Sequence, residues 1–243
     1  MRMVSLNYRG LGNLRSIREL HSIVKTEAPQ VVFLMETRLN RKKLERLRIR
    51  LGFSSCLGVD RVGREGGLAF MWSEDVRISI KNYSSSHIDG DITDEIGLVW
   101  RINGFYGESV TTNRIRSWNL LRHLHSQSNI LWLVMGDFNE IVDQREKLGM
   151  LDRNEVQMQR FRSALTDCSL VDLGFSGWLF TWSNRRDGVA KTWVRLDRGV
   201  CTQQWLDFFP NARIRHISVA TSDHLGLVLD TLGSNLSGPR KPK

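Results

Sequence analysis

Cysteine is scarce in this sequence, and long hydrophobic runs are absent from it. The three cysteines, Cys56, Cys168 and Cys201, are odd in number and far apart, so neither a disulfide framework nor a zinc-ligand spacing follows from them. No apolar stretch approaches the ~20 residues of a membrane-spanning helix, and the N-terminus lacks the apolar core of a signal peptide. We therefore expect an intracellular protein in a reducing compartment, without a membrane partner.

Acidic residues are the minority among the charged ones. The 243 residues include 26 Asp and Glu against 35 Lys and Arg, which gives a net charge of +9. A basic protein favours an anionic partner, most often nucleic acid, although the same charge also serves solubility alone. Hydrophobic residues make up 41% of the chain, enough for the core of one large α/β domain or two small ones.

The first fifty residues alternate between strand and helix patterns. Residues 1–7 and Val31–Met35 are apolar and typical of strands. The apolar residues within Leu14–Glu27 recur at helical spacing and predict an amphipathic helix. A second, basic helix is predicted over Arg41–Leu51, because an asparagine suited to N-capping precedes it and a glycine follows it.

From residue 53 onwards, short β-prone runs alternate with clusters of Gly, Asp and Ser, which is typical of strands joined by hairpins. Helices are predicted at residues 112–126 and 156–165. The predicted strands are residues 67–72, 76–83, 96–105, 130–135, 179–182, 192–196, 213–219 and 225–229. Two sheets with helices outside account for this pattern better than one doubly wound sheet. We expect one domain, residues 1–232, and a disordered polar tail, residues 233–243.

The apolar run 130–135 leads into Gly136-Asp137-Phe138-Asn139, the most informative stretch of the chain. Strand side chains alternate, so Asp137 and Asn139 would emerge together at the end of a buried strand, where ligands usually bind in α/β sheets. An ionised Asp accepts hydrogen bonds and an Asn also donates them, so the pair can hold a water. Gly, Asp and Asn are also ordinary turn residues, and the local sequence leaves that alternative open.

Other predicted strands also end near residues that can bind metal or phosphate. These residues are Asn7, Glu36, Tyr106, Asp197 and the trio Ser222-Asp223-His224. Each is common in loops, but together they supply carboxylates for a hard cation, a histidine, a phenol and amides. The sequence has no Ser-His-Asp order, glycine-rich phosphate loop or cysteine nucleophile, which favours metal-assisted hydrolysis over covalent catalysis.

The segments around these residues resemble the endonuclease/exonuclease/phosphatase superfamily, and within it the apurinic-type endonuclease domain of plant LINE-type non-LTR retrotransposons. The segments are Leu6-Asn7-Tyr8-Arg9-Gly10-Leu11-Gly12, Phe33-Leu34-Met35-Glu36-Thr37, Gly104-Phe105-Tyr106-Gly107, Gly136-Asp137-Phe138-Asn139-Glu140, Thr181-Trp182-Ser183-Asn184, Arg195-Leu196-Asp197-Arg198 and Ser222-Asp223-His224. They follow the family order and span nearly the whole chain. The resemblance implies a four-layer α/β sandwich like that of DNase I, with two packed mixed β-sheets flanked by helices.

The resemblance also implies a Mg2+ site, with Mn2+ as an alternative cofactor. Glu36 would be the principal direct ligand, and Asn7 and Asp223 would lie close to the metal. Asp137 would orient or deprotonate the attacking water, and Asn139 would position that water and the phosphate. General chemistry agrees, because Mg2+ prefers oxygen ligands and commonly uses one or two carboxylates together with substrate phosphate.

The resemblance implies roles for five further residues around the phosphate. His224, oriented by Asp197, would contact the scissile phosphate and stabilise its developing charge. Tyr106 would hydrogen-bond a phosphate oxygen. Thr181 and Ser222 would support the phosphate or the residues that bind it.

Two basic features bear on the substrate. Arg9 stands where apurinic-site repair enzymes of the superfamily usually carry a carboxylate, two residues after the first asparagine. A cation there cannot ligate Mg2+ but can meet a phosphate, which fits the retroelement branch better than efficient abasic-site repair. The basic segment 38–50 is either a solvated helix face or a phosphate-tracking surface.

The sequence therefore predicts a Mg2+-dependent DNA endonuclease that hydrolyses a phosphodiester and leaves a 3′-hydroxyl. In a LINE-type element such a nick would prime reverse transcription. We expect a monomer that acts on DNA in the nucleus. One alternative is another enzyme of the same fold, such as a phosphatase of inositol phosphates or lipids or an RNA deadenylase. The other is a catalytically silent retroelement remnant that binds nucleic acid.

Overall fold

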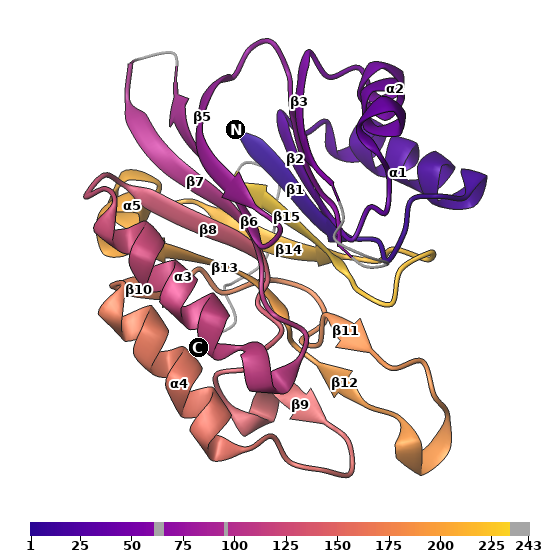
Figure 1. The fold of residues 1–243 in the computed structure, drawn as a ribbon, viewed down its shortest axis with the longest axis vertical. Helices are drawn as coiled ribbons and strands as arrows, with labels where there is room; N and C mark the ends of the chain where they lie inside the picture. The colour runs from indigo at the N-terminus through magenta and orange to yellow at the C-terminus, as the bar shows by residue number, and fades with distance from the viewer. Residues whose placement is uncertain (61–65, 95–96, 234–243) are drawn as a thin grey trace.

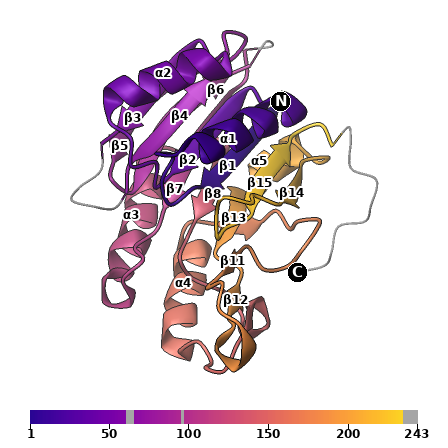
Figure 2. The same cartoon turned by 90° about the vertical axis from the view of Figure 1, so that its right-hand side faces the viewer.

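The computed structural model describes residues 1–60, 66–94 and 97–233, which form two six-stranded β-sheets packed face to face. Helices α1 (Leu14–Glu27) and α2 (Arg41–Leu51) cover the outer face of one sheet (Figure 1, Figure 2). Helices α3 (Ile115–Ser126) and α4 (Glu155–Asp167) cover the outer face of the other. The predicted four-layer α/β sandwich is therefore confirmed.

Both large sheets are mixed. The first contains β1 (Arg2–Asn7), β2 (Val31–Met35), β3 (Ser55–Val59), β4 (Leu68–Trp72), β14 (Arg213–Ile217) and β15 (Gly226–Asp230), in the order β14-β15-β1-β2-β4-β3. The second contains β5 (Arg77–Ser84), β6 (His87–Thr93), β7 (Val99–Tyr106), β8 (Trp132–Asp137), β10 (Leu170–Asp172) and β13 (Asp197–Thr202), in the order β10-β13-β8-β7-β6-β5. A small third sheet joins β11 (Trp182–Ser183), β12 (Trp193–Val194) and β9 (Lys147–Leu148).

The main core lies between the two large sheets. Phe33 and Phe70 of the first sheet and Trp100 and Met135 of the second are at most 2% exposed and belong to one apolar cluster. Burying aromatic side chains of this size contributes most of the stability of such an interface. The packing of these side chains fixes how the ends of the two sheets face each other.

The helices form as their sequences predict. The Asn13 side chain caps α1 by accepting a hydrogen bond from the backbone N–H of Ser16, and Asn40 caps α2 in the same way through Lys43. On the other side of the molecule, the stacked rings of Trp118 and Phe161 have their centroids 4.5 Å apart and hold α3 against α4.

The arrangement of parallel strands determines where polar strand ends meet. β1 runs parallel to β2 in the first sheet, and β7 runs parallel to β8 in the second. The register of the second pair places Tyr106 opposite Asp137, and antiparallel β13 begins beside them with Asp197 opposite Asp137. The carboxyl ends of both parallel pairs thus lie at the same edge of the sandwich, where ligands commonly bind.

Residues 87–93 were predicted to connect two strands, because this stretch contains Gly and Asp. That prediction is wrong, since these residues form strand β6, which lies between β5 and β7 in the sheet. Asp89 of β6 is fully buried because its carboxylate forms a bidentate ion pair with Arg101 of β7, at 2.7 and 2.8 Å. A partner on the neighbouring strand replaces the water that an aspartate normally requires. Four further strands, β3, β9, β10 and β13, and the short α-helix α5 (Gln203–Phe208) were not predicted.

Part of two sequence predictions falls outside the described residues. One is residue 96 of the strand predicted at residues 96–105; the observed strand, β7, begins at Val99. The other is the predicted tail, of which residues 234–243 are not described. All three cysteines are free. Among the helices described, none has the length and apolar character needed to cross a bilayer.

The contact between the sheets generates a stability prediction at Gly104 in β7. A Cβ atom added there would lie 2.4 Å from Cδ2 of Phe33 in the opposite sheet. Overpacking of this kind costs about 1–3 kcal/mol, so we expect Gly104→Ala to lower the free energy of unfolding by that amount in urea denaturation. Gly12→Ala is the matched control, since no atom lies within 4 Å of its added Cβ. Equal stability of the two variants would contradict the described packing.

Candidate active site

A cavity of about 380 Å³ lies at the edge where the parallel strands end, bounded by both large sheets and by the small third sheet. The residues of the predicted site that line it are Arg9, Glu36, Tyr106, Asp137, Asn139 and His224. Asn7 and Asp197 lie directly behind them, hydrogen-bonded to residues of the lining. The fold therefore gathers residues from distant parts of the chain into one cleft.

The amide of Asn7 joins two carboxylates that belong to different sheets. Its Nδ2 atom donates to Glu36 Oε1 at 3.0 Å and to Asp137 Oδ2 at 3.1 Å. The hydroxyl of Tyr106 donates to the same Glu36 oxygen at 3.1 Å. Tyr106 thus reaches the centre of the site, where its proton is engaged by Glu36; its contact with a phosphate stays a prediction.

Asp137 and Asn139 both line the cavity, but strand alternation is not the reason, because β8 ends at Asp137 and Asn139 lies in the following turn with a φ of 55°. The last residue of β8 is Asp137, whose Oδ1 accepts a hydrogen bond from the Asn139 backbone N–H at 2.8 Å. The Asn139 side chain donates to the Gly107 carbonyl at 2.8 Å. A residue with a Cβ cannot replace Gly136, because the added atom would lie 2.0 Å from the Phe105 carbonyl oxygen. The tight approach of β7 and β8 at this point thus brings Asp137 beside Tyr106.

A histidine–carboxylate pair lies on the other side of Asp137. His224 Nδ1 lies 2.8 Å from Asp197 Oδ2, and His224 Nε2 lies 3.9 Å from Asp137 Oδ2. An ionised carboxylate only accepts hydrogen bonds, so we assign a proton to Nδ1. Asp197 therefore orients the imidazole and leaves Nε2 directed toward Asp137.

Thr181 and Ser222 hold the backbone that carries this pair. Thr181 Oγ1 accepts hydrogen bonds from the backbone N–H groups of Leu196 and Asp197, both at 2.9 Å. Ser222 Oγ donates to the Asn7 carbonyl and accepts from the His224 backbone N–H. Both hydroxyls are buried and position their neighbours. A direct contact of either with phosphate stays a prediction.

Burial and neighbouring charges shift the pKa values of the two central groups. Burial is the main cause that raises the pKa of Asp137 to about 7; Asp197 adds to the shift and His224 opposes it. Burial lowers the pKa of His224, but the carboxylates of Asp197 and Asp137 outweigh it and raise this pKa to about 9. At neutral pH His224 is therefore an imidazolium beside a carboxyl group whose pKa suits a general base.

Two groups of side chains could hold a divalent cation. Ligand atoms of Asp137, Asp197 and His224 lie within 4.8 Å of one another. A protonated imidazole has no lone pair for a metal, so this trio is the weaker ligand set. Glu36 is the stronger candidate: its Oε2 accepts no hydrogen bond from the described residues and has only Arg38 Nη2 as an ion-pair contact, at 3.9 Å. The Asp137 carboxylate lies nearby, joined to Glu36 through the Asn7 amide. This oxygen-rich set suits a hard cation.

Asp223 and Arg9 pair with each other. Arg9 Nη1 lies 2.6 Å from Asp223 Oδ2, which also accepts a hydrogen bond from Trp182 Nε1 at 2.9 Å. Asp223 Oδ1 is buried and has no hydrogen-bond partner among the described residues. The predicted metal role of Asp223 and phosphate role of Arg9 are not tested by these contacts, which show that the arginine neutralises the carboxylate.

Strained backbone is concentrated at the cavity. Of the seven non-glycine residues with positive φ in the described chain, four line it, namely Arg9, Glu36, Arg38 and Asn139, with φ between 48° and 55°. Such conformations cost of order 1–3 kcal/mol each for most residues and persist where function requires a particular side-chain direction. Their concentration here supports assigning the functional site to this cavity.

Three further cations of the cavity lining were not expected from the sequence. Arg114, Lys147 and Arg153 line the cavity, although none is close to a strand-ending motif. Glu140, which directly follows Asn139, is fully buried; its carboxylate lies 2.7 Å from Arg114 Nη1 and 2.9 Å from Arg153 Nε. The glutamate after the Asp-Phe-Asn segment was the one available signal, because a buried carboxylate requires cationic partners.

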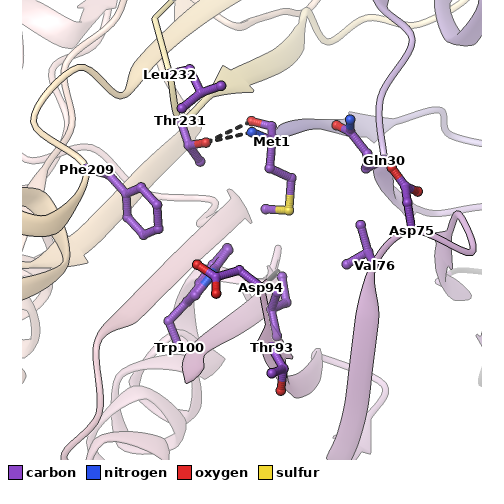
Figure 3. A pocket seen from close by; sticks show the side chains of 11 residues that line it. Met1, Gln30, Asp75, Val76, Thr93, Asp94, Trp100, Phe209, Thr231 and Leu232 are labelled. Atoms are coloured by element: carbon purple, nitrogen blue, oxygen red, sulfur yellow. Dashed lines mark hydrogen bonds between the residues drawn. The ribbon is translucent and has the colours of Figure 1, made fainter. Parts of the chain in front are cut away.

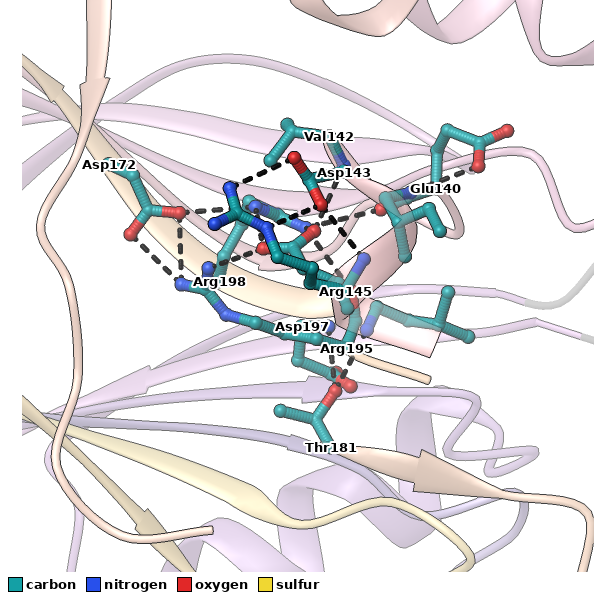
Figure 4. Close-up of polar contacts among 12 residues, drawn as sticks. Glu140, Val142, Asp143, Arg145, Asp172, Thr181, Arg195, Asp197 and Arg198 are labelled. Atoms are coloured by element: carbon teal, nitrogen blue, oxygen red, sulfur yellow. Dashed lines mark hydrogen bonds and ion pairs between the residues drawn. The ribbon is translucent and has the colours of Figure 1, made fainter. Parts of the chain in front are cut away.

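A second buried ion network supports the loop that follows β8 (Figure 4). Arg198 of β13 has a fully buried side chain and pairs with Glu146 at 2.7 Å and with Asp172 at 3.1 Å. Arg195 contacts the same two carboxylates at 2.7 and 2.9 Å. Removing one member would leave a buried charge unpaired, which costs several kcal/mol, ~3–5 in measured cases. This network holds residues 140–148 against β13.

The basic segment 38–50 contributes only Arg38 to the cavity lining. The cations of α2 lie on its exposed face, whereas its leucines are buried. Arg48 donates to the Phe53 and Ser54 carbonyls and pairs with Glu45, so it stabilises the end of its own helix. These contacts fit the solvated-face alternative, and phosphate tracking by the helix stays a prediction.

Another cavity, of about 360 Å³, lies at the opposite edge of the sandwich (Figure 3). Its lining includes the apolar side chains of Val76, Trp100 and Phe209, and Thr231 there hydrogen-bonds the first residue of the chain. The lining contains two aspartates but no histidine, lysine or arginine from the described residues. It lacks the combination of cations and poised acid–base groups that marks the first cavity.

A two-sheet α/β sandwich with carboxylates, an imidazolium and surrounding cations at one edge has the fold and the side chains of a phosphoester hydrolase. Comparison with protein-family models agrees: residues 4–224 match the Endonuclease/Exonuclease/phosphatase family, and the chain belongs to this family. A search of curated proteins found no match.

Solved structures of similar fold include nucleases from several sources. A 3′-5′ exonuclease of Neisseria meningitidis has a TM-score of 0.72 at 15% identity, covering 95% of this chain and 99% of that one. The endonuclease domain of TRAS1, a telomere-specific non-LTR retrotransposon, has a TM-score of 0.67 at 14% identity, with 94% and 97% covered. An AP endonuclease from Archaeoglobus fulgidus has a TM-score of 0.71 at 15% identity, with 95% and 98% covered. At such identities the likeness establishes the fold.

The charge on Asp197 generates a prediction about His224. In Asp197→Asn the carboxylate that raises the His224 pKa is lost while burial still lowers it, so we expect that pKa to fall by about 1–3 units. The measurement is a 15N NMR titration of the His224 ring in metal-free protein. Because the pKa of His224 is higher in the folded protein (about 9) than in the unfolded chain (about 6.5), its imidazolium stabilises the fold at low pH. The free energy of unfolding of the parent should therefore fall as the pH rises from about 6.5 through about 9, and that of the variant should fall less.

The control for this titration is Asp187→Asn, which makes the same charge change at an exposed position. It should leave the His224 titration as in the parent. An unchanged His224 pKa in Asp197→Asn would show that the carboxylate is not its main electrostatic partner.

Proposed function

We propose that this protein is a Mg2+-dependent endonuclease that hydrolyses a phosphodiester bond of DNA and leaves a 3′-hydroxyl. The observation that carries the proposal is the position of Asp137. This buried carboxyl has a pKa raised to about 7 and lies 3.9 Å from the Nε2 atom of His224, at the centre of a cleft whose lining includes five cations.

The residues of the cleft divide the work of hydrolysis. Asp137 takes a proton from the attacking water, a role that contributes roughly 10²–10⁴-fold in rate. Asn139 orients that water through its side-chain oxygen, since its Nδ2 already donates to Gly107. His224, held protonated and oriented by Asp197, donates from Nε2 to a phosphate oxygen as negative charge develops on it.

Glu36 would hold the Mg2+ ion, with Asn7 and Asp137 beside it. When bound, the metal supplies Lewis-acid polarisation of a phosphoryl oxygen and neutralisation of the leaving oxygen. The Asn7 amide holds the carboxylates of Glu36 and Asp137 close together by donating a hydrogen bond to each. Tyr106 restrains the Glu36 carboxylate from the other side through its hydroxyl.

DNA is favoured as the substrate by the charges around the cleft. The lining includes Arg9, Arg38, Arg114, Lys147 and Arg153, and the whole chain carries a net charge of +9. Five cations from separate parts of the chain around one cleft suit a polyanion with several phosphates, whereas a small phosphate ester needs fewer of them.

The segments of LINE-type endonucleases in this sequence, and the similarity in fold to the TRAS1 endonuclease domain, support a retrotransposon-type origin. We infer a monomer that acts in the nucleus, where such an enzyme would meet its DNA. A phosphatase of the same fold is the second candidate, because one structure of similar fold is described as a 3′ phosphatase bound to a product DNA hairpin.

The direct test is nicking of supercoiled plasmid. We expect the protein to convert it to the open-circular form with Mg2+ and not with EDTA, and the nicks to be extended by a DNA polymerase without prior phosphatase treatment. Asp137→Asn should slow nicking by at least about 10²-fold, because it removes the base. Asp207→Asn, an exposed aspartate of α5 at the far edge, should nick like the parent.

Two results would contradict the proposal. Well-folded parent protein that does not nick with Mg2+ is not the proposed endonuclease, and parallel assays on inositol phosphates, a 3′-phosphorylated oligonucleotide and poly(A) then distinguish the alternatives of the same fold. If Asp137→Asn nicks at the parental rate, the base has been assigned to the wrong residue.

A further inference from the structure

Arg153 differs from Arg114 and Lys147 in that its side chain makes no hydrogen bond to the described residues. It lies just before α4, its side chain is 19% exposed, and it lines the catalytic cavity. Its Nε lies 2.9 Å from Glu140 Oε1 in an ion pair whose N–H does not point at the oxygen. Neither terminal amino group of its guanidinium has a hydrogen-bond partner among the described residues.

The side chains of Arg114 and Lys147 both donate hydrogen bonds to other groups of the protein. Arg114 donates to Glu140 at 2.7 Å and to the carbonyls of Glu108 and Ser109 at 3.4 and 3.3 Å. Lys147 Nζ donates to the Leu151 carbonyl. These two side chains therefore hold the loops around the cavity. The two terminal amino groups of Arg153 remain available to a ligand.

Arg114, Arg153 and Glu140 form one corner beside the cavity, and their charges do not cancel. The one carboxylate of Glu140 is shared by two guanidinium groups, which leaves a net charge of +1 in a partly buried place. A guanidinium with two parallel N–H donors matches the oxygens of a phosphate, and low exposure to water strengthens such a contact. The corner therefore has the charge and the donor geometry of a phosphate subsite.

The position of this corner determines which phosphate it can reach. Glu140 follows Asn139 directly, and consecutive Cα atoms are ~3.8 Å apart. The anchor of Arg153 is therefore close to the water-positioning residue and is shared with Arg114 just before α3, whereas His224 lies just before β15 and is anchored on Asp197 of β13. Arg153 and His224 line the same cavity, so a strand whose scissile phosphate meets His224 can present a neighbouring phosphate to Arg153.

We propose that Arg153, oriented by the buried carboxylate of Glu140, binds the phosphate that adjoins the scissile phosphate on the cleaved strand. This inference rests on the proposed function, because it takes the substrate to be a nucleic-acid strand. His224 contacts the scissile phosphate and Arg153 its neighbour, so the strand is held at two consecutive phosphates. Glu140 acts as a positioning residue and Arg114 as its second partner.

The test measures binding in EDTA, so that it does not depend on cleavage. The probe is a 20-base-pair DNA duplex, titrated at several salt concentrations with the parent, Arg153→Gln and Arg153→Lys. Loss of one phosphate contact should reduce the slope of log affinity against log salt by about 0.9 in Arg153→Gln. Arg153→Lys should restore the slope, since it keeps the charge, while binding remains weaker without the two-pronged contact.

Arg77→Gln is the matched control, because Arg77 is exposed on the edge strand β5 and away from the cavity. It should bind with the parental slope. Thermal unfolding of all variants checks that the fold is intact; Glu140 keeps Arg114 as a partner when Arg153 is replaced. A purely structural role for Arg153 would lower stability without a change in slope that lysine restores.

The identity of the phosphate is tested at a nick site mapped in the plasmid assay. Replacing the adjoining phosphate with a neutral methylphosphonate should raise KM of the parent about tenfold and add little to that of Arg153→Gln. An unchanged salt slope in Arg153→Gln, absence of salt-dependent binding by the parent, or an equal methylphosphonate penalty in both proteins would overturn the inference. Failure of the parent to nick while Arg153→Gln lowers the slope would instead count against the proposed endonuclease alone.

Discussion

The two hydrogen bonds donated by the Asn7 amide are the interaction on which the site depends. They join Glu36 of the first sheet to Asp137 of the second, at 3.0 and 3.1 Å. The two carboxylates can stay this close only because the apolar faces of the sheets are packed against each other and the parallel strands end at the same edge. A shift of either sheet would separate the groups that bind metal and water, so the core between the sheets determines the chemistry at their edge.

Burial gives the site its electrostatic character and also imposes its largest costs. Asp137 and His224 have shifted pKa values because water is excluded from them and because Asp197 lies beside both. The loops that complete the cleft are held by two ion networks, one centred on Glu140 and one on Glu146. Such networks contribute modestly to stability but specify one arrangement, since every alternative leaves a buried charge unpaired. We infer that the strained backbone of Glu36 and Asn139 is maintained by this rigid surrounding structure.

Much of the fold was predictable because its local signals are strong. The strands and helices of the first fifty residues have the predicted positions, since apolar periodicity and the capping side chains of Asn13 and Asn40 act within a few residues. Strand β6 was missed because Gly and Asp usually indicate turns, and only Arg101 on the next strand makes buried Asp89 tolerable. Most of the candidate site was also predictable, as polar residues at strand ends converge once parallel strands share an edge.

The sequence by itself determined the types of side chain, their order and most of the elements that carry them, because those follow from spacing along the chain. Only the tertiary structure decided the pairing of Arg9 with Asp223, the free donors of Arg153 beside Glu140, and the pKa values of Asp137 and His224. Each of these depends on the distance between segments remote in sequence and on the exclusion of water. Neither quantity is encoded in any local pattern of residues.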